Sequence, residues 1–173
     1  EIMKPATEIA QNSGLEVLAF DIPQLHNYNG ELYCRVLAEH LIAAPPAYVC
    51  IAQTSRGLDF APALAVELDS ACISGIEDLL PAEDGVCFAR PLYGGKAVAH
   101  IRADTRTAVL IVQPGVFKPS RPTTAKSGRV ALKSVAIEPE WWHALGLKHL
   151  DTDTAGISEA DVVVGAGQGF GDR

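Results

Sequence analysis

The chain has 173 residues, of which 48% are hydrophobic and 20% charged, a balance typical of a globular protein and not of a disordered one. Its formal net charge of −7 argues against nucleic acid as the main partner, because phosphate binding needs a basic patch. No stretch reaches the roughly 18 consecutive apolar residues that a membrane-spanning helix needs, so we expect no membrane insertion. A chain of this length predicts one domain with a substantial core, and at most the start of a second.

The cysteines and histidines show none of the spacings that are typical of metal or redox sites. None of the 4 cysteines forms a CxxC pair, and none of the 5 histidines stands in an HxH or HExxH pattern. Three cysteines lie inside apolar runs, and we interpret Cys50, Cys72 and Cys87 as small buried hydrophobic residues. Unpaired thiols indicate a reducing compartment, so we expect the bacterial or archaeal cytoplasm, or the mitochondrial matrix in a eukaryote.

The first forty residues predict a helix, a strand and a second helix. Residues 1–14 have an apolar face at helical spacing and end at a glycine, which indicates a helix and not a signal peptide. Because the chain starts inside this helix without methionine, we expect it to be a piece of a longer protein. Residues 15–20 predict a strand buried on both faces. Asn29 is suited to cap a helix over residues 31–44.

A second strand, residues 48–53, is followed by the loop Thr54–Gly57 and a helix over residues 58–68. A loop that follows a parallel strand and opens a helix is where α/β proteins bind ligands, and its helix N-terminus could hold an anion. The loop has neither a GxGxxG nor a GxxxxGK[ST] pattern. We therefore favour a plain capped helix start, in which Gly57 permits a tight turn.

The middle of the chain predicts consecutive strands. After a short strand at residues 71–76, Val86–Tyr93 turns at Gly94-Gly95 into Lys96–Arg102, the pattern of a hairpin. A further strand is predicted at Thr107–Gln113, so we expect three or four strands with antiparallel character attached to a βαβα unit. We interpret the acidic residues of this region as a solvated loop face and not as a cation site: Glu77, Asp78, Glu83 and Asp84.

Residues 118–157 predict a linker and crossing segment. Its start is rich in Pro, Ser and Lys, a possible strand lies at residues 130–137, and Trp141-Trp142 is suited to pack at a domain junction. In residues 158–173, Asp161 and three valines are followed by a glycine loop. A strand that leads into a glycine loop is how a nucleotide-binding α/β unit begins.

Four segments of the chain match, in order, four segments of one protein family. The first has the pattern T-x-x-G-x-D-x-A-P, matched by Thr54, Gly57, Asp59, Ala61 and Pro62. The second, R-P-x-x-G/A-G-x-x-x-A, is matched by Arg90, Pro91, Gly94 or Gly95 and Ala99. The third, V-R-P-G-x-F, is matched by Val112, Pro114, Gly115 and Phe117, with Gln113 in place of the arginine. The fourth is V-V-S-G-G-R-G, matched by Val163, Val164, Gly165, Ala166, Gly167, Gln168 and Gly169. In this order they make the chain resemble the α subunit of electron-transfer flavoproteins over nearly its whole length.

The resemblance implies a three-layer α/β/α Rossmann-like domain, with a mostly parallel sheet and an antiparallel hairpin region. Residues 1–117 would be the amino-terminal domain, without the family's first strand–helix–strand, and residues 158–173 the start of the FAD-binding domain. The implied function is that of an electron carrier and not of a catalyst. The intact protein would pair with a β subunit and shuttle electrons from dehydrogenases to a quinone reductase through FAD. No side chain of this chain is expected to be catalytic.

The resemblance implies cofactor-binding roles for Gly167, Gln168 and Gly169. Gln168 stands where the family has an arginine beside the flavin. Loss of that cation would remove a favourable interaction with a reduced, anionic flavin, although glutamine still donates a hydrogen bond. Because nearly all of the FAD domain is absent, we expect the isolated chain not to retain FAD.

Two other functions remain open at the level of the residues. One is an adenine-nucleotide-binding α/β module without FAD, in which Thr54–Gly57 would hold phosphate and which should bind AMP or ATP. The other is a dehydrogenase truncated just after its glycine loop. The position of that loop argues against it, because the loop follows a linker near the end of the chain and not the first strand of a βαβ unit.

Overall fold

The computed structural model describes residues 2–23, 25, 27–83, 85–118, 128–136, 146, 157, 160–167 and 169. The chain divides into two compact units, residues 1–140 and 141–173. The described part of the first unit contains these helices and strands: α1 (Met3–Ser13), β1 (Val17–Asp21), α2 (Gly30–Ala43), β2 (Tyr48–Ala52), α3 (Ser55–Glu67), β3 (Ala71–Ile76), β4 (Asp78–Ala82), β5 (Gly85–Leu92), β6 (Ala97–Ile101), β7 (Ala108–Val112) and β8 (Val130–Ser134).

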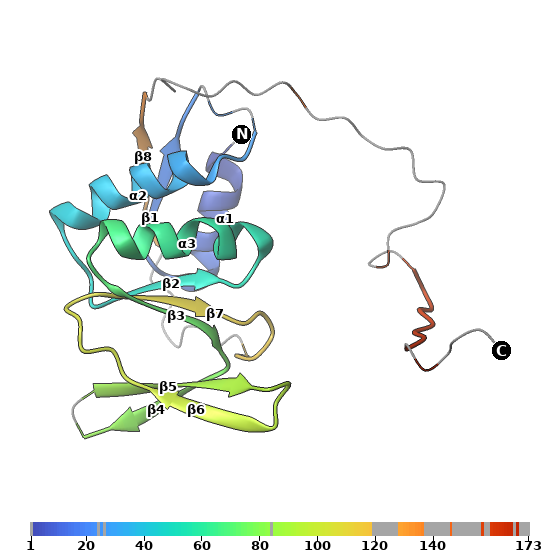
Figure 1. Cartoon of the computed structure of the whole chain (residues 1–173). Helices are drawn as coiled ribbons and strands as arrows, with labels where there is room; N and C mark the ends of the chain where they lie inside the picture. The colour runs from blue at the N-terminus through green and yellow to red at the C-terminus, as the bar shows by residue number, and fades with distance from the viewer. Residues whose placement is uncertain are drawn as a thin grey trace. The chain divides into compact units, whose positions relative to one another are not determined.

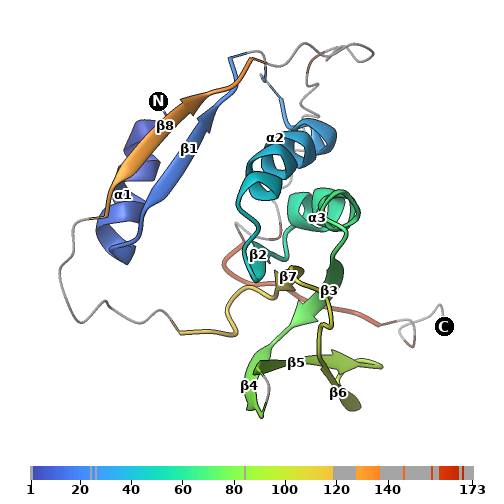
Figure 2. The same cartoon turned by 90° about the vertical axis from the view of Figure 1, so that its left-hand side faces the viewer.

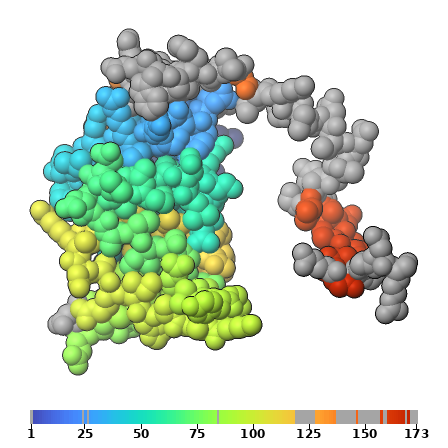
Figure 3. All heavy atoms as spheres, in the orientation of Figure 1, coloured from blue at the N-terminus to red at the C-terminus, as the bar shows by residue number. Residues whose placement is uncertain are grey.

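The first unit has the expected α/β architecture with mostly parallel strands. One parallel sheet has the order β2-β7-β3, and β1 and β8 form a second parallel pair. Helix α1 lies on one side of the β1–β8 pair, and α2 lies on the other side (Figures 1 and 2). Helices α2 and α3 lie side by side on the surface of this unit (Figure 3). The layers therefore confirm the Rossmann-like α/β/α prediction.

The helix ends follow their sequence signals. Gly14 has a left-handed φ of 69° and its N–H bonds to the Ala10 carbonyl oxygen, which ends α1. The Asn29 side chain accepts a hydrogen bond of 2.9 Å from the N–H of Leu32 and caps α2, as predicted. Helix α3 begins at Ser55 and not at Leu58, because the Thr54 hydroxyl oxygen already caps it.

The hairpin predicted at Gly94-Gly95 is confirmed. Strands β5 and β6 pair antiparallel, and β4 pairs antiparallel with the other edge of β5. The turn needs left-handed backbone at three successive residues, with φ values of 53° at Tyr93, 66° at Gly94 and 85° at Gly95. Phe88 of β5 is 1% exposed and packs against β3 and β7, so this small sheet shares a core with the parallel one.

The predicted antiparallel character is wrong for β7. This strand leaves the hairpin region and lies between β2 and β3, parallel to both, with Ala108 opposite both Tyr48 and Ala71. Its run of apolar residues explains the position, because the centre of a parallel sheet is covered on both faces. Val109 and Ile111 pack against α3, whereas Leu110 packs with Phe88.

Part of the predicted linker belongs to a sheet. Strand β8 lies within residues 118–157, and it pairs in parallel with β1, from Val17 opposite Val130 to Asp21 opposite Ser134. The strand expected at residues 130–137 is therefore present over Val130–Ser134. Residues 119–127, which join β7 to β8, and the pair Trp141-Trp142 lie outside the described residues.

The strand predicted at the three valines near the carboxyl end is not formed. Residues 162–167 have no regular secondary structure, and Val162 and Val164 are 80% and 89% exposed. A strand is stable only when other strands and an apolar layer accompany it. Among the described residues of the second unit there is no strand with which the valines could pair.

Two of the cysteine predictions are wrong. Cys50 and Cys72 are exposed and Cys87 is half-buried, whereas Cys34, which was not singled out, is buried in α2. Residues alternate along β2, so Cys50 points away from the helix that covers Val49 and Ile51. Cys72 lies on β3, an edge strand.

None of the helices in the described part of the chain is long and apolar enough to cross a membrane.

Candidate functional site

The predicted cofactor loop lies in the second unit. Gly167 and Gly169 are described and exposed, whereas Gln168 lies outside the described residues. Among the described residues, a Cβ atom added at Gly165, Gly167 or Gly169 would meet nothing within 4 Å apart from its chain neighbours. Packing therefore does not require glycine at these positions. Glycine backbone in general lets a ligand approach closely, so the cofactor-binding role of these residues stays a prediction.

The described residues around the glycine loop do not enclose a ligand. Cofactor sites are concave and bury most of the ligand, with apolar side chains around it. Here Val162, Val163 and Val164 are 80%, 58% and 89% exposed, so in the described residues they line no enclosed space. In the described residues the loop therefore forms no enclosed site by itself.

The loop Thr54–Gly57 is a capped helix start, as favoured from the sequence. The Thr54 hydroxyl oxygen accepts a 3.1 Å hydrogen bond from the N–H of Gly57. Gly57 is buried, and a Cβ at this position would collide with the backbone carbonyl oxygen of Ala52 at the end of β2. Thr54 and Gly57 are therefore both engaged in contacts that join β2 to α3. This occupation argues against a phosphate-binding role for the loop.

Asp59, another residue of the first family segment, holds the loop before α2. The Tyr28 hydroxyl donates a 2.8 Å hydrogen bond to Asp59 Oδ2, and the Arg56 guanidinium lies 5.2 Å from the centre of the Tyr28 ring. The Tyr28 ring also makes an edge-on contact with Tyr33, at 5.1 Å between ring centres. The interaction ties the chain before α2 to the first turn of α3. Nothing in the sequence spacing links Asp59 to Tyr28.

This contact has a consequence at high pH. Burial, together with the hydrogen bond to Asp59 and its negative charge, raises the pKa of Tyr28 from 10.0 to about 12. Between these values the folded chain keeps a proton that the unfolded chain loses, so stability should fall as the pH rises through this window. We expect Tyr28→Phe to make this fall shallower, as measured by urea unfolding across the window.

The matched control for Tyr28→Phe is Tyr93→Phe, because Tyr93 is 82% exposed in the hairpin turn. This variant should keep the alkaline loss of stability of the unmodified chain. An equally steep loss in the Tyr28→Phe variant would show that the Tyr28 hydroxyl does not cause it.

A polar cluster that the sequence did not reveal lies at the carboxyl ends of β2 and β3. Arg90 Nη1 donates a 3.5 Å hydrogen bond to Ser74 Oγ. Arg90 Nε and Gln53 Oε1 are buried without a partner among the described residues, and both lie beside Gly75, which has a φ of 71°. The register of β3 shifts at this glycine, as in a β-bulge. The glycine inside the apolar run 71–76 is the feature of the sequence that could have indicated this irregularity of β3.

Two of the described residues of the predicted acidic face are exposed, whereas Glu77 is half-buried. Asp78 and Glu83 are exposed, and the Asp78 carboxylate accepts a 2.8 Å hydrogen bond from the N–H of Leu79. Asp84 lies outside the described residues. Within the part of the chain that the structure covers, no three His, Cys, Asp or Glu side chains are grouped so that they could hold a metal ion.

Comparison with known proteins decides the family. A family model described as the electron transfer flavoprotein domain matches residues 3–138. The chain belongs to the electron transfer flavoprotein family. It is 26% identical over 164 residues to the electron transfer flavoprotein subunit alpha of Bacillus subtilis, covering 95% of this chain and 50% of that protein. It is 27% identical to the subunit alpha of Megasphaera elsdenii, covering 97% and 52%, and 26% identical to the FixB protein of Clostridium saccharobutylicum, covering 96% and 51%.

The match confirms the resemblance drawn from the sequence segments. Three of the four segments, Thr54–Pro62, Arg90–Ala99 and Val112–Phe117, lie inside the range of the family model, whereas the glycine loop lies after it. The chain spans about half the length of the curated relatives it matches. Family membership therefore rests on the first unit.

Proposed function

We propose that this chain is part of the α subunit of an electron transfer flavoprotein. Its first unit serves as the α/β scaffold, and residues 158–173 begin the domain that binds FAD. The observation that carries the proposal is the family match over residues 3–138. The names of the curated relatives, which are α subunits and FixB proteins, support it.

In the proposed function the intact protein carries electrons and performs no substrate chemistry of its own. It pairs with a β subunit, accepts electrons from dehydrogenases on FAD and passes them to a quinone reductase, in the cytoplasm of a bacterial or archaeal cell. The geometry of the first unit supports a scaffold role, because Thr54, Gly57 and Asp59 are engaged in capping, close packing and hydrogen bonding.

The flavin content of the purified protein tests whether this part of the subunit is enough to hold FAD. We expect the purified 173-residue chain to stay colourless after incubation with FAD and gel filtration, because the described valines beside the glycine loop are exposed and enclose no ligand. The complete subunit, co-expressed with its β subunit, should retain FAD and be bleached by a reduced dehydrogenase. Stoichiometric flavin on the 173-residue chain would contradict this assignment.

Titration with AMP and ATP tests the alternative function, an adenine-nucleotide-binding module without FAD. Binding of either nucleotide to the chain without FAD, and loss of that binding in Thr54→Ala, would favour an adenine-nucleotide-binding module. We expect no such binding, because the Thr54 hydroxyl already accepts a hydrogen bond from the N–H of Gly57.

A further inference from the structure

Three parallel strands of the first unit end at the same edge of their sheet. Strands β2, β7 and β3 run in one direction, and the N–H of Gln53, directly after β2, bonds to the Val112 carbonyl oxygen at the end of β7. The N–H of Gln113 in turn bonds to the carbonyl oxygen of Ile76, the last residue of β3. Helix α3 also begins here, at Ser55. The carboxyl ends of parallel strands are where open α/β sheets bind ligands.

An arginine of the antiparallel sheet reaches this edge. Arg90 of β5 donates its 3.5 Å hydrogen bond from Nη1 to Ser74 Oγ of β3. In front of Gly75, the position of an added Cβ lies 4.0 Å from Arg90 Nε and 3.8 Å from Gln53 Oε1. These two side-chain atoms are buried and have no hydrogen-bond partner among the described residues. Side chains from three strands therefore converge here, and we call Arg90, Ser74 and Gln53 the edge cluster.

The positive charge of Arg90 has no counter-ion among the described residues. There, the acidic and basic side chains that approach within 4.0 Å of each other are Arg35 and Glu39 of α2. A guanidinium carries five N–H donors, and a charge that is partly removed from water is costly unless an opposite charge pairs with it. Arg90 is half-buried, so its side chain still reaches the surface. An anion bound there would complete the edge cluster.

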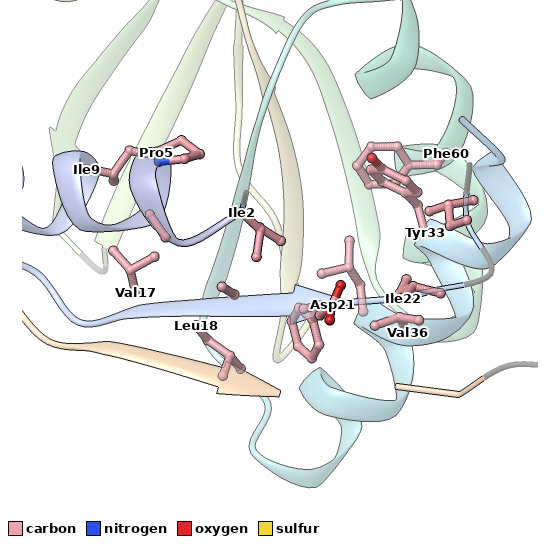
Figure 4. Close-up of a pocket in the computed structure, with 15 residues that line it drawn as sticks. Ile2, Pro5, Ile9, Val17, Leu18, Asp21, Ile22, Tyr33, Val36 and Phe60 are labelled. Atoms are coloured by element: carbon pink, nitrogen blue, oxygen red, sulfur yellow. The ribbon is translucent and has the colours of Figure 1, made fainter. Parts of the chain in front are cut away.

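The cavity beside β1 does not offer this chemistry. It has a volume of about 610 Å³, and Asp21 is the only charged side chain among the described residues that line it (Figure 4). Arg90 instead lines a second cavity, of about 510 Å³, together with Pro91, Val98 and Phe117. Ligand sites usually have volumes of about 300–1,000 Å³ and mostly apolar walls. The second cavity therefore has room for a ligand whose charged group meets Arg90.

We propose that the edge cluster binds a carboxylate group, with Arg90 as the residue that pairs with it and Ser74 and Gln53 beside the guanidinium. The carboxylate belongs either to a small molecule or to an acidic side chain of a partner protein, and both present the same two oxygens. This inference goes beyond the proposed electron-transfer function and does not depend on it, because it rests on the edge cluster and its cavity alone.

The shape and charge of the site favour a carboxylate over a phosphate. The planar fork of a guanidinium matches the two oxygens of a carboxylate, so two parallel hydrogen bonds can form. The other ionisable side chains among the described residues of the cavity wall are Glu77, Asp78 and His100. Two carboxylates near one guanidinium repel an anion of higher charge more strongly than a singly charged one.

Titration followed by amide NMR tests the proposal on the 173-residue chain. The probes are sodium acetate, sodium benzoate and a Glu-Glu-Glu peptide with blocked ends, and sodium chloride at equal ionic strength controls for salt. We expect saturable shifts of the backbone amides of Gln53, Ser74 and Gly75. Arg90→Gln should weaken binding by at least about tenfold, the usual effect of losing hydrogen bonds from a charged donor.

Arg102→Gln is the matched control, because it removes the same charge from an exposed position just after β6. It should keep the affinity of the unmodified chain. The two kinds of probe distinguish the sources of the carboxylate. Tighter binding of benzoate than of the peptide assigns the site to a small molecule with an apolar body, and the reverse assigns it to a partner protein. Either order, with the loss in Arg90→Gln, supports the proposal.

Thermal unfolding gives a second measurement if Arg90→Gln does not fold. A ligand that binds only the folded chain raises its Tm, so saturating benzoate or peptide should raise the Tm of the unmodified chain and of Arg102→Gln, but not of Arg90→Met. Three outcomes overturn the proposal. Absence of saturable shifts with every carboxylate would show a solvated arginine. An equal loss of binding in Arg102→Gln would show a general charge effect, and tighter binding of inorganic phosphate than of any carboxylate would show another class of ligand.

Discussion

Phe88→Ala should lower the free energy of unfolding of this chain by about 3–5 kcal/mol, the usual cost of truncating a buried phenylalanine. Phe88 is 1% exposed and lies in one cluster with Ile73, Ile76 and Leu110. Its ring also makes an edge-on contact with Tyr48 of β2, at 5.6 Å between ring centres. The substitution therefore opens a cavity where the antiparallel sheet meets three strands of the parallel one.

Urea unfolding measures this loss, and Val98→Ala is the control. Val98 lies on β6 of the same small sheet but is 60% exposed, so its truncation should change stability by no more than about 0.5 kcal/mol. Equal losses in both variants would show that the shared core at Phe88 does not join the two sheets. A loss confined to Phe88→Ala, with a normal unfolding slope, supports one cooperative unit.

The local elements of this fold could be predicted because their signals are local. Gly14 ends α1 through its own left-handed backbone, and Asn29 caps α2 through a bond to the third residue after it. Gly94 and Gly95 supply the positive φ values that the hairpin needs. In each case the residues that interact are neighbours in the chain, so the sequence carries the whole signal.

The pairing of β7 and β8 could not be predicted for the opposite reason. A run such as residues 108–112 is apolar in any buried strand, and nothing in it distinguishes a third hairpin strand from the centre of a parallel sheet. The choice depends on β2 and β3, which lie far away in the chain. Likewise, β8 is mostly exposed and follows a polar segment, so its pairing with β1 leaves only a weak pattern.

In the candidate site, too, the local features could be predicted from the sequence and the contacts between distant elements could not. The glycine loop and the segment around Thr54 were found as patterns, because glycines and capping residues have fixed local uses. The hydrogen bonds of Tyr28 with Asp59 and of Arg90 with Ser74 join different elements and became visible only in the structure. Gln168, the residue on which the flavin expectation depends most, lies outside the described residues, so its role stays a prediction.

Gly57→Ala is expected to destabilise the chain by about 2 kcal/mol, against the direction that helix propensity alone gives. Inside a helix, alanine is more stable than glycine by about 1 kcal/mol, and Gly57 is the third residue of α3. Its added Cβ, however, would collide with the carbonyl oxygen of Ala52, a backbone atom held by the pairing of β2 with β7. Overpacking costs about 1–3 kcal/mol, occasionally more, and a backbone neighbour that cannot rotate away places this case at the upper end.

Thermal and urea unfolding of Gly57→Ala, with Ser55→Ala as its control, measure the balance of these two effects. Ser55 is exposed in the same helical turn, so its substitution should change stability by no more than about 0.5 kcal/mol. A more stable Gly57→Ala variant would show that the backbone near the Ala52 carbonyl oxygen can shift at little cost to make room for the added Cβ. The glycine of the family segment would then need another explanation, such as close approach of a ligand to the α3 N-terminus. The expected loss instead assigns Gly57 to the junction of β2 and α3, which is the scaffold role proposed for this unit.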